Sequence, residues 1–501
     1  MSKYNEIIEW ASRRSIFYPA SEIYANSPAG LWNFGPYGEA IRRKIIDMWR
    51  KELIQKEGML EIYGAQIMSE DIFNSSGHLS GFNDPFTSCV KCGTLYRADE
   101  IIKDVIHKNV PEKLPEKELD GLIEKNKIVC PKCNGKLNSV KRKNMMVKVE
   151  IGASGKKSCY LRPESCQSIF LDFDRMVKTM RVTLPKGIAQ VGSVARNEIS
   201  PRQSLIRQVE FSQFEAEVFF NPDKINEIEN FDEVKNYKIR MLLDGKDKVE
   251  DIKAEDLFKK KLVAGKLIAY YLARTQQLYE KYGIPRAKIR FREVGKDERP
   301  FYSGGTFDLE IETDLGWLEV VANNYRTDYD LKGHSVGSKK ELTFVEDGKK
   351  FIPHIWEISG GLDRTFYAII DNALKKEKVK DEERTVLSLN PRLAPYDAAI
   401  LPLVNKDKIP EKSKKILKML IEEGFNIFYD ESGSIGKRYR RMDEVGVAGC
   451  MTIDYDSLKK EDITLRDRDS LKQVRIKIKE LPEKLKSFLN GEKIEKLGKK
   501  L

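Results

Sequence analysis

Hydrophobic residues recur along this chain at two spacings, one typical of helices and one typical of strands. From Glu39 to Ile54 the apolar positions lie three or four residues apart, which predicts an amphipathic helix. From Val209 to Glu217 apolar and polar residues alternate, which predicts a strand with one packed and one polar face. The same spacings predict helices over residues 3–15, 168–177, 256–282 and 412–423, and strands within residues 289–312, 317–321, 397–404, 425–429 and 450–455.

A boundary between domains is predicted in the stretch LNPRLAP, residues 389–395. Beyond it, strands and a helix alternate over short distances, which predicts a mixed, mostly parallel α/β domain. The loop expected from Ser432 to Gly446 carries several Lys and Arg residues and a Tyr, a composition suited to contact with RNA. A generic α/β module with a basic loop is the alternative.

Composition narrows the class of protein without identifying it. With 501 residues, of which 41% are hydrophobic and 33% charged, the chain is long enough for about two to four domains with full cores. The formal charge of +11 suits a polyanionic partner, although basic proteins without such a partner are common. Residues 1–14 have no apolar core of signal-peptide length, and no apolar run approaches a membrane span. We therefore expect a cytoplasmic protein without membrane association.

Four of the seven cysteines form two CxxC pairs, Cys89 with Cys92 and Cys130 with Cys133. Each pair is followed by Gly or Asn, which permits the tight turn that directs backbone amides at thiolates. Four thiolates make a closed tetrahedral structural site, so the spacing predicts bound Zn²⁺ in a reducing compartment. The alternative is two unligated reduced pairs. The remaining cysteines have no partners at ligand spacing and are expected to be buried: Cys159, Cys166 and Cys450.

The segment from Arg196 to Glu217 combines the residue types that bind a nucleotide and an amine. It is predicted to be strand, loop and strand, with arginines at the loop and carboxylates along the second strand. The arginines Arg196, Arg202 and Arg207 offer planar forks for phosphate. Phe211 could stack on a base, and a carboxylate such as Glu215 suits an ammonium group. The alternative is an ordinary hairpin with surface charge.

This segment resembles motif 2 of the class II aminoacyl-tRNA synthetases, in the form found in glycyl-tRNA synthetases of the dimeric archaeal and eukaryote type (FRNEISPR…IRxREFxxxExE). Residues 162–170 resemble the family's RPETAQGIF, and residues 316–331 its GWxExxGxADRxxYDL. Residues 357–364 resemble motif 3, which reads EPSFGxxR in the family, with Phe at the position of Gly360. Residues 432–446 and 464–475 resemble two stretches of the family's anticodon-binding domain. The chain departs from the family pattern at Ser165, Cys166, Ser168, Ala195, Val209, Ala322, Asn324, Tyr325, Ile358 and Gly360.

The resemblance implies an α/β fold in which an α+β catalytic core, an antiparallel sheet flanked by helices, occupies residues 1–390. Insertions are expected at about 86–148, with the zinc site, and at about 222–290. A C-terminal mixed α/β anticodon-binding domain would span residues 391–501. The helix beginning at Glu39 matches motif 1, which lies at the dimer interface in the family, so a homodimer is expected. His78, in the SGH turn, is expected to be structural in preference to catalytic.

The implied activity is that of a glycine–tRNA ligase, which activates glycine with ATP and transfers it to tRNA(Gly), with Mg²⁺ bound alongside ATP. The catalytic residues would be Arg196, Glu198 and Arg364. Glycine would be bound by Arg97, Glu164, Phe211, Ser212, Gln213, Phe214, Glu215, Arg326, Glu357, Ser359 and Gly361. ATP would be bound by Arg196, Asn197, Glu198, Ile206, Arg207, Phe211, Glu319, Val320, Gly361, Leu362, Asp363 and Arg364, with Glu319 holding the magnesium.

Two other functions remain open at the level of sequence. The departures from the family pattern are compatible with a synthetase paralogue that has lost catalysis and acts as an RNA- or protein-binding module. A sister enzyme for serine, threonine, proline or histidine would leave the RPE, EISPR and RDRDS stretches unexplained. Retention of Glu164, Arg196, Glu319 and Arg364 favours the enzyme, because drift would remove charged groups first.

Overall fold

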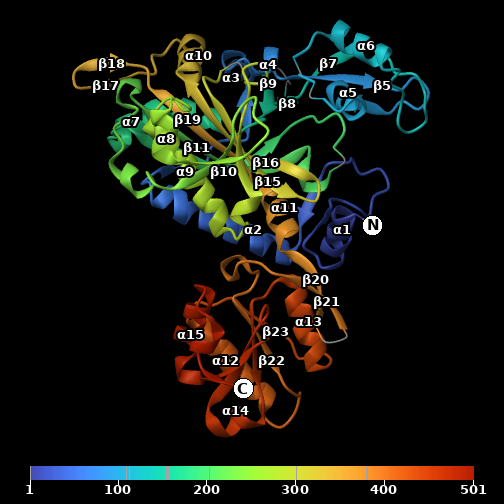
Figure 1. Ribbon diagram of the computed structural model, residues 1–501, viewed down its shortest axis with the longest axis vertical. Helices are drawn as coiled ribbons and strands as arrows, with labels where there is room; N and C mark the ends of the chain where they lie inside the picture. The colour runs from blue at the N-terminus through green and yellow to red at the C-terminus, as the bar shows by residue number, and fades with distance from the viewer. Residues whose placement is uncertain are drawn as a thin grey trace.

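The computed structural model describes residues 2–501 except residues 109, 112, 154–156, 202, 301 and 380–381, so Arg202 lies outside the described residues. The chain forms two bodies, stacked along the long axis of the molecule (Figure 1). The larger body is built on a nine-stranded sheet and the smaller, C-terminal body on a six-stranded sheet. The hairpin of β20 (Leu374–Val379) and β21 (Glu382–Leu387) lies between them.

The nine-stranded sheet is antiparallel, as predicted, except at β12 with β14 and at β10 with β3. Its long central strands, β15, β16, β19, β11 and β10, place residues far apart in sequence side by side. In spatial order the strands are β13 (Glu250–Lys253), β12 (Lys238–Leu242), β14 (Ile289–Glu293), β15 (Thr306–Thr313), β16 (Gly316–Thr327), β19 (His354–Gly361), β11 (Glu210–Phe220), β10 (Lys186–Ala195) and β3 (Leu60–Glu61).

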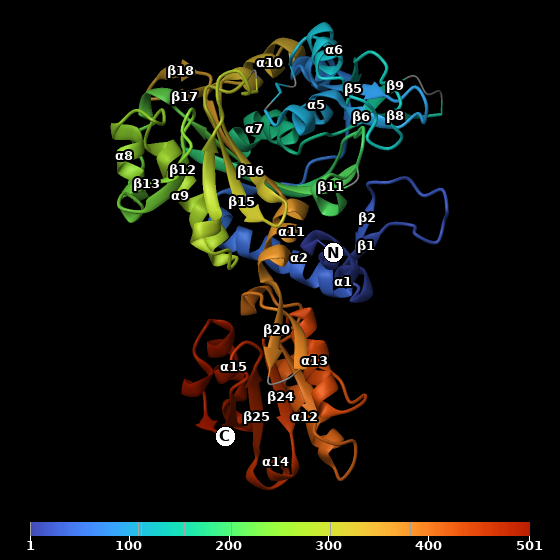
Figure 2. The same ribbon diagram turned by 45° about the vertical axis from the view of Figure 1, so that its right-hand side comes forward.

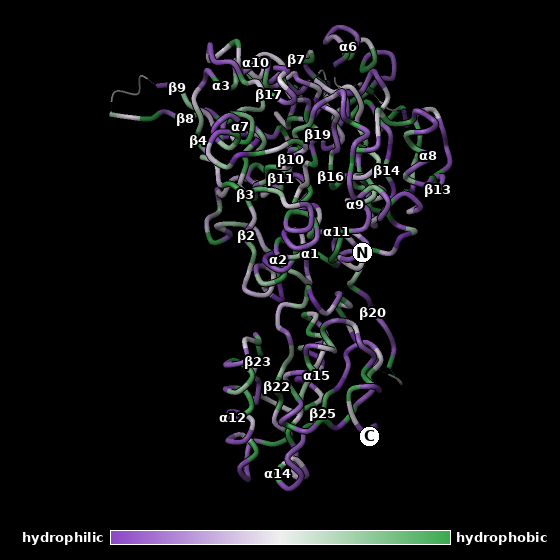
Figure 3. Tube along the Cα trace, turned by 90° about the vertical axis from the view of Figure 1, so that its left-hand side faces the viewer, coloured by the Kyte–Doolittle hydropathy of each residue, from purple (hydrophilic) through white to green (hydrophobic). Residues whose placement is uncertain are grey.

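The alternation predicted for residues 209–217 is realised in β11. Phe214, Ala216 and Val218 enter the hydrophobic core on one face of the sheet. That face is covered by α2 (Pro36–Trp49), whose Trp49 ring lies 5.5 Å from the Phe214 ring between centroids. The helix predicted to run to Ile54 ends as an α-helix at Trp49 and continues as a π-helical segment, η1 (Arg50–Gln55). Hydrophobic and hydrophilic positions are mixed along these elements (Figure 3), as expected for elements with one buried face.

The prediction of a single helix over residues 256–282 is wrong, because two helices occupy this range. The first, α8 (Ala254–Lys259), ends before a turn, and α9 (Lys266–Lys281) begins after Gly265. Gly265 is extended, and a Cβ there would lie 2.8 Å from Ile225 Cγ1, so the chain passes too close to Ile225 for a side chain. The other helices of the larger body are α1 (Lys3–Arg13), α3 (Glu70–Ser75), α4 (His78–Gly81), α7 (Cys166–Met180), α10 (Tyr329–Ser338) and α11 (Leu362–Ala373).

A small subdomain with its own apolar core projects from the larger body (Figure 2). It contains two helices together with a three-stranded sheet. Its elements are β5 (Asn83–Ser88), β6 (Leu95–Arg97), α5 (Ala98–Ile106), α6 (Glu116–Lys125) and β7 (Lys141–Asn144). A second three-stranded sheet connects it to the body: β4 (Ile67–Ser69), β9 (Lys157–Leu161) and β8 (Val147–Ile151). Two short hairpins complete the body, β1 (Phe17–Pro19) with β2 (Trp32–Phe34) and β17 (Phe344–Glu346) with β18 (Lys349–Phe351).

The C-terminal body is a mixed α/β domain, as predicted, but it is not mostly parallel. Only β22 is parallel to its neighbours β23 and β24, whereas the described pairs from β24 to β27 are antiparallel. In spatial order its strands are β23 (Ile427–Tyr429), β22 (Ala398–Pro402), β24 (Gly449–Ile453), β25 (Asp462–Asp467), β26 (Gln473–Lys477) and β27 (Lys499–Lys500). Three of its helices are α12 (Ile409–Glu422), α14 (Tyr455–Lys460) and α15 (Leu481–Leu489).

The basic segment expected to be a loop after Ser432 forms a helix, α13 (Ile435–Val445). Ser434 precedes it in an extended conformation, and Gly446 ends it in the left-handed conformation (φ 89°) that glycine adopts at helix ends. The helical spacing of the buried residues of α13 is hard to recognise in the sequence, because arginines lie among them. Among the described residues, no helix has the length and apolar character needed to cross a membrane.

Candidate active site and metal centre

A cavity opens on the face of the central sheet opposite α2, above β11, β16 and β19. It brings together most of the residues predicted for glycine and ATP. The predicted residues that line it are Glu164, Arg196, Glu198, Ile206, Arg207, Phe211, Gln213, Glu319, Val320, Glu357, Ser359, Gly361, Asp363 and Arg364. Five further lining residues were not assigned to the site from sequence: Leu205, Gln208, Tyr302, Ala322 and Asn324.

The period of two along the strands explains which predicted residues reach the cavity. Phe211 and Gln213 point from β11 to this side, whereas Ser212 and Phe214 lie on the opposite face. Arg42 of α2 donates to Ser212 Oγ (2.9 Å), and the Ser212 amide donates to Asp363 Oδ2 (3.1 Å). The alternation along β11, which is visible in the sequence, separates these two faces.

Arg196 is held in the cavity wall between two aromatic rings. Its Cζ lies 5.3 Å from the ring centroids of both Phe82 and Phe211, and its Nε donates to the Pro163 carbonyl (3.0 Å). These contacts fix the plane of the guanidinium by cation–π attraction. The next residue, Asn197, is exposed, and its Oδ1 accepts from Lys143 Nζ (3.0 Å) outside the cavity lining.

The small subdomain reaches the cavity through an ion pair. Arg207 donates to both oxygens of Glu100, from α5, at 2.8 and 2.5 Å. Its Nε also lies 3.9 Å from Glu198 Oε2. Arg97, predicted to bind the substrate, lies outside the cavity lining and pairs with Asp84 (2.7 Å) and Asp99 (2.7 Å) of the same subdomain.

Arg364 stands in the first turn of α11, where β19 ends at Gly361. Its Nε donates to the Ile206 carbonyl (3.1 Å), and its Nη1 lies 3.7 Å from Glu319 Oε2. The Glu319 side chain is 47% exposed at the cavity mouth. The backbone amides of the α11 N-terminus add partial positive charge to this end of the cavity. Leu362, the first residue of α11, is buried in the core.

Carboxylates gather at the opposite end of the cavity, around a completely buried arginine. Arg326, which is 1% exposed, donates to Asp330 (2.7 and 2.9 Å) and to Glu357 Oε1 (2.8 Å). Its Nη2 lies 3.9 Å from Glu164 Oε1. Burial raises the pKa of Glu357 to about 7 against the attraction of Arg326. Glu215 is fully buried behind these groups, and burial with nearby carboxylates raises its pKa well above the usual value.

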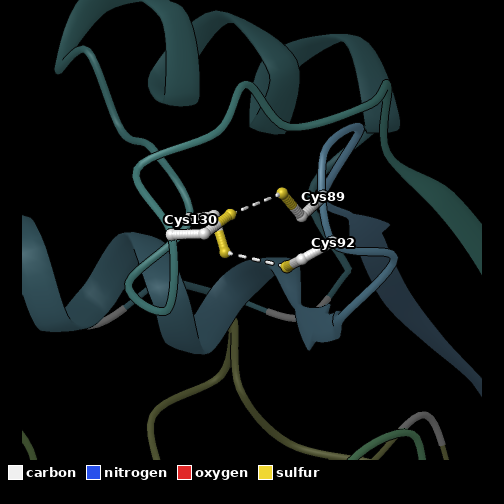
Figure 4. Close-up of side chains that lie close together, drawn as sticks. Cys89, Cys92 and Cys130 are labelled. Carbon is white, nitrogen blue, oxygen red and sulfur yellow. Dashed lines mark hydrogen bonds between the residues drawn. The ribbon is translucent and has the colours of Figure 1, made fainter.

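The four cysteines of the two CxxC pairs converge on one point in the small subdomain. Cys89 Sγ lies 3.5 Å from Cys133 Sγ and Cys92 Sγ lies 3.7 Å from Cys130 Sγ, and all four sulfurs lie within 4.8 Å of one another. Figure 4 shows Cys89, Cys92 and Cys130 directed toward a common centre. Zn–S bonds of about 2.3 Å in a tetrahedron place sulfurs about 3.8 Å apart, so the arrangement fits Zn²⁺.

The turns after the two pairs also fit a metal centre. Gly93 and Asn134, which follow the second cysteine of each pair, both have positive φ (71° and 54°). A Cβ at Gly135 would lie 2.8 Å from Cys89 Sγ, so the backbone approaches the sulfurs as closely as glycine allows. Both features agree with the tight turns predicted from the sequence.

The chain is similar to known proteins over nearly its whole length. Residues 148–373 match the family model "tRNA synthetase class II core domain (G, H, P, S and T)", and residues 397–488 match "Anticodon binding domain". Glycine–tRNA ligases of Methanothrix thermoacetophila, Thermococcus gammatolerans and Methanocaldococcus jannaschii are similar to it at 34%, 36% and 35% identity. The alignments cover 97–98% of this chain and 98–99% of each relative.

The chain belongs to the glycine–tRNA ligase family of class II aminoacyl-tRNA synthetases. Membership confirms the predicted family and fold class, a class II core with a C-terminal anticodon-binding domain. It also excludes the alternative of a sister synthetase for another amino acid, since the match to glycine–tRNA ligases extends over nearly the whole chain.

Two of the departures from the glycine–tRNA ligase pattern point away from the cavity. A Cβ at Gly360 would lie only 1.8 Å from Cε2 of Phe214, its direct partner across the strands, so the Phe214 ring occupies that space. Tyr325 stacks on Phe220 (5.9 Å between centroids), and its hydroxyl contacts His354 Nδ1 (2.6 Å). These substitutions therefore alter the core of this ligase without altering the cavity wall.

Two of the departures that face the substrate region donate hydrogen bonds to its carboxylates. Asn324 lines the cavity, and its Nδ2 donates to Glu357 Oε2 (2.6 Å) while its Oδ1 accepts from Thr306 Oγ1 (2.6 Å). Cys166 is buried beside the cavity, and its thiol donates to Glu164 Oε1 (2.9 Å). Each of these residues donates a hydrogen bond to a carboxylate of the site, and neither replaces a charged residue of the family pattern. The charged groups of the site are therefore retained at these two positions.

Proposed function

We propose that this chain activates glycine with ATP and transfers it to tRNA(Gly), with the cavity above β11, β16 and β19 as its active site. The observation that carries the proposal is the polarity of the cavity. Arginines and a helix N-terminus lie at one end, near Arg364, and carboxylates lie at the other, near Glu164. A triphosphate and an ammonium group would satisfy the two ends together.

At the acidic end, Glu164, Glu357 and Ser359 would receive the glycine ammonium. Gln213 supports this arrangement, because its Nε2 donates to Ser359 Oγ (3.2 Å) and its Oε1 accepts from the Ser165 amide (3.0 Å). The Ser165 hydroxyl in turn donates to the buried Glu215 (3.2 Å). Arg326 would not touch the substrate: it holds Glu357 and Asp330 behind the cavity wall.

At the basic end, Arg196 would contact both the glycine carboxylate and the α-phosphate. A carboxylate oxygen would attack the α-phosphorus, forming glycyl-adenylate as the bond to pyrophosphate breaks. Arg196 is suited to stabilise the charge that develops on the phosphorus, because its stacking between Phe82 and Phe211 removes the cost of orienting it. Arg207 and Arg364 would hold the outer phosphates, and the exposed face of Phe211 would support adenine.

Mg²⁺ bound with ATP would neutralise phosphate charge during the attack on the α-phosphorus. The half-exposed carboxylate of Glu319 is the hard oxygen ligand that would hold it together with ATP. In the second step the terminal hydroxyl of tRNA would attack the glycyl carbonyl, and AMP would leave. This step needs no covalent intermediate on the enzyme.

We also propose that Cys89, Cys92, Cys130 and Cys133 hold a structural Zn²⁺ that stabilises the small subdomain. Purified protein should contain about one zinc per chain by elemental analysis. Replacement of Cys92 and Cys130 together by Ser should remove it, whereas Cys159→Ser, a matched control outside the cluster, should not. Full zinc retention in the double variant would contradict the proposal.

The remaining assignments extend the family resemblance. We propose a catalytic domain over residues 1–390, with insertions at about 86–148 and 222–290, and an anticodon-binding domain over residues 391–501 that contacts tRNA(Gly). We also propose a cytoplasmic homodimer whose interface includes the α2 segment. Light scattering during gel filtration tests the dimer, because a mass near that of one 57.7 kDa chain would contradict it.

Exchange of pyrophosphate into ATP, measured with varied glycine and varied ATP, tests the two ends of the cavity separately. Glu164→Gln should raise the KM for glycine by about 10- to 100-fold, the effect of losing a charged hydrogen bond, and leave the KM for ATP near its original value. Arg364→Ala should raise mainly the KM for ATP. If both variants changed both constants equally, the division of the cavity would be wrong. A catalytically inactive paralogue would show no exchange.

A further inference from the structure

The two oxygens of Glu164 are in different situations. Three donors converge on Oε1: the Cys166 thiol at 2.9 Å, Gln167 Nε2 at 3.1 Å and His78 Nε2 at 3.2 Å. The side chain is 14% exposed and lines the cavity. Because the three donors engage one oxygen, the carboxylate is fixed with its other oxygen, Oε2, toward the open side.

His78 comes from a segment remote from Glu164 in sequence and is rigidly held. It follows Gly77, whose φ of 80° is left-handed, and it is 9% exposed. Its ring lies edge-on to Phe73 and Phe82, with centroids 6.0 and 5.8 Å away. Nδ1 lies 2.8 Å from Ser76 Oγ. If the Ser76 hydroxyl donates to Nδ1, Nε2 carries the proton and donates to Glu164.

A second histidine orients the amide that binds the same oxygen. Gln167 uses its Nε2 on Glu164, so its Oε1 must accept, and it does so from His334 Nε2 of α10 (2.9 Å). Glu164 is thus held by groups from α4, α7 and α10. These contacts have an electrostatic effect too: burial alone would raise the pKa of Glu164, but His78 and Arg326 hold it well below its usual value.

We propose that His78 is a positioning residue for glycine binding, which holds Glu164 through Oε1 so that Oε2 meets the substrate ammonium. The inference rests on the proposed role of Glu164 as the ammonium ligand. Without His78 the carboxylate keeps its charge but gains rotational freedom, so the ammonium must select one orientation among several. His78 itself touches neither glycine nor ATP.

Two amide substitutions of His78 separate positioning from simple packing. The side-chain amide in His78→Gln reaches the place of Nε2, whereas that in His78→Asn reaches only the place of Nδ1. In pyrophosphate exchange, we expect His78→Asn to raise the KM for glycine by about 10-fold or more, with the KM for ATP within about twofold and kcat within about threefold. His78→Gln should bring the KM for glycine back to within about threefold of the original protein.

Further variants decide between the possible causes. In a Glu164→Gln background, His78→Asn should change the KM for glycine by less than about twofold, because the group it positions is already altered. His354→Gln, at a partly buried histidine that contacts Tyr325 on the opposite face, is the matched control and should change neither constant. If His78→Asn proves unstable, Ser76→Ala removes the Nδ1 partner without altering the ring and should raise the KM for glycine alone.

Each outcome has a definite reading. The inference is overturned if His78→Asn leaves the KM for glycine unchanged, if His78→Gln is equally impaired, or if the constants for glycine and ATP rise together. If Glu164→Gln raises the KM for glycine and His78→Asn does not, only the role of His78 fails. If Glu164→Gln itself leaves that constant unchanged, the assignment of the ammonium site fails, and the inference fails with it.

Discussion

A large residue, Phe214, and a small one, Gly360, are paired on neighbouring strands, and their packing leads to a testable prediction about stability. Phe214 and Gly360 are direct partners on β11 and β19, and both face α2. The family pattern has Phe at position 360, whereas here the Phe214 ring fills that space. It is 1% exposed and packs on Trp49. The Phe214 ring therefore occupies the space that a side chain at position 360 would need.

The magnitudes follow from burial and overlap. Phe214→Ala should lower the free energy of unfolding by about 3–5 kcal/mol, the usual cost of deleting a buried aromatic ring. Gly360→Phe alone should cost about 1–3 kcal/mol or more, because its Cβ would lie 1.8 Å from Phe214 Cε2. In the double variant, Phe214→Ala removes the obstacle and Gly360→Phe refills the space. The loss of unfolding free energy in the double variant should be smaller than the sum of the two single losses, with a coupling of about 1–3 kcal/mol.

Urea unfolding followed by tryptophan fluorescence is the assay, since all five tryptophans precede residue 390. The matched control combines Gly360→Phe with Phe173→Ala. Phe173 stacks on Phe219 in a separate core cluster, so the two losses should add. The double variant at 214 and 360 should also keep its glycine-dependent exchange, because both positions face away from the cavity. Simple addition of the losses at 214 and 360 would refute the reasoning.

Three further predictions concern charged groups. Glu100→Gln releases Arg207 from its ion pair, so the KM for ATP in pyrophosphate exchange should fall by about 2- to 5-fold; an unchanged value would contradict this. Burial raises the pKa of Glu357 to about 7, so its carboxylate is largely neutral below that pH and charged above it. The KM for glycine should therefore fall as the pH rises from about 6 to 8, and the Glu357→Gln variant should lack this dependence. Glu444 of α13 binds two arginines at the end of α1, so Glu444→Gln should lower tRNA charging while leaving pyrophosphate exchange intact; equal losses in both would argue against a link between the bodies.

The sequence was sufficient for features that depend on local spacing. The alternation from Val209 to Glu217 predicted β11, and the two CxxC pairs with their following Gly and Asn predicted the cysteine cluster. The order of the motifs predicted the family. These features are encoded within a few residues, or in matched stretches, and need no knowledge of strand register.

Features that depend on register or on remote contacts were not accessible. The relation of Phe214 to Gly360 requires the pairing of β11 with β19, and the contact of His78 with Glu164 joins segments 86 positions apart (164 minus 78). The sequence alone accordingly predicts a structural role for His78 and identifies no partner for it. Assigning Ser212 and Phe214 to the glycine site ignored the period of two, which places them on the face opposite the cavity.

The most direct test of the account is amino-acid-dependent exchange of pyrophosphate into ATP by the purified protein, with alanine and serine as controls. The account predicts exchange with glycine and background levels with both controls, because the acidic end of the cavity should accept the ammonium of an amino acid without a side chain. Absence of exchange with every amino acid, in protein shown to be folded and dimeric, would contradict the proposed catalysis. Equal exchange with alanine would contradict the assignment of glycine to this end of the cavity.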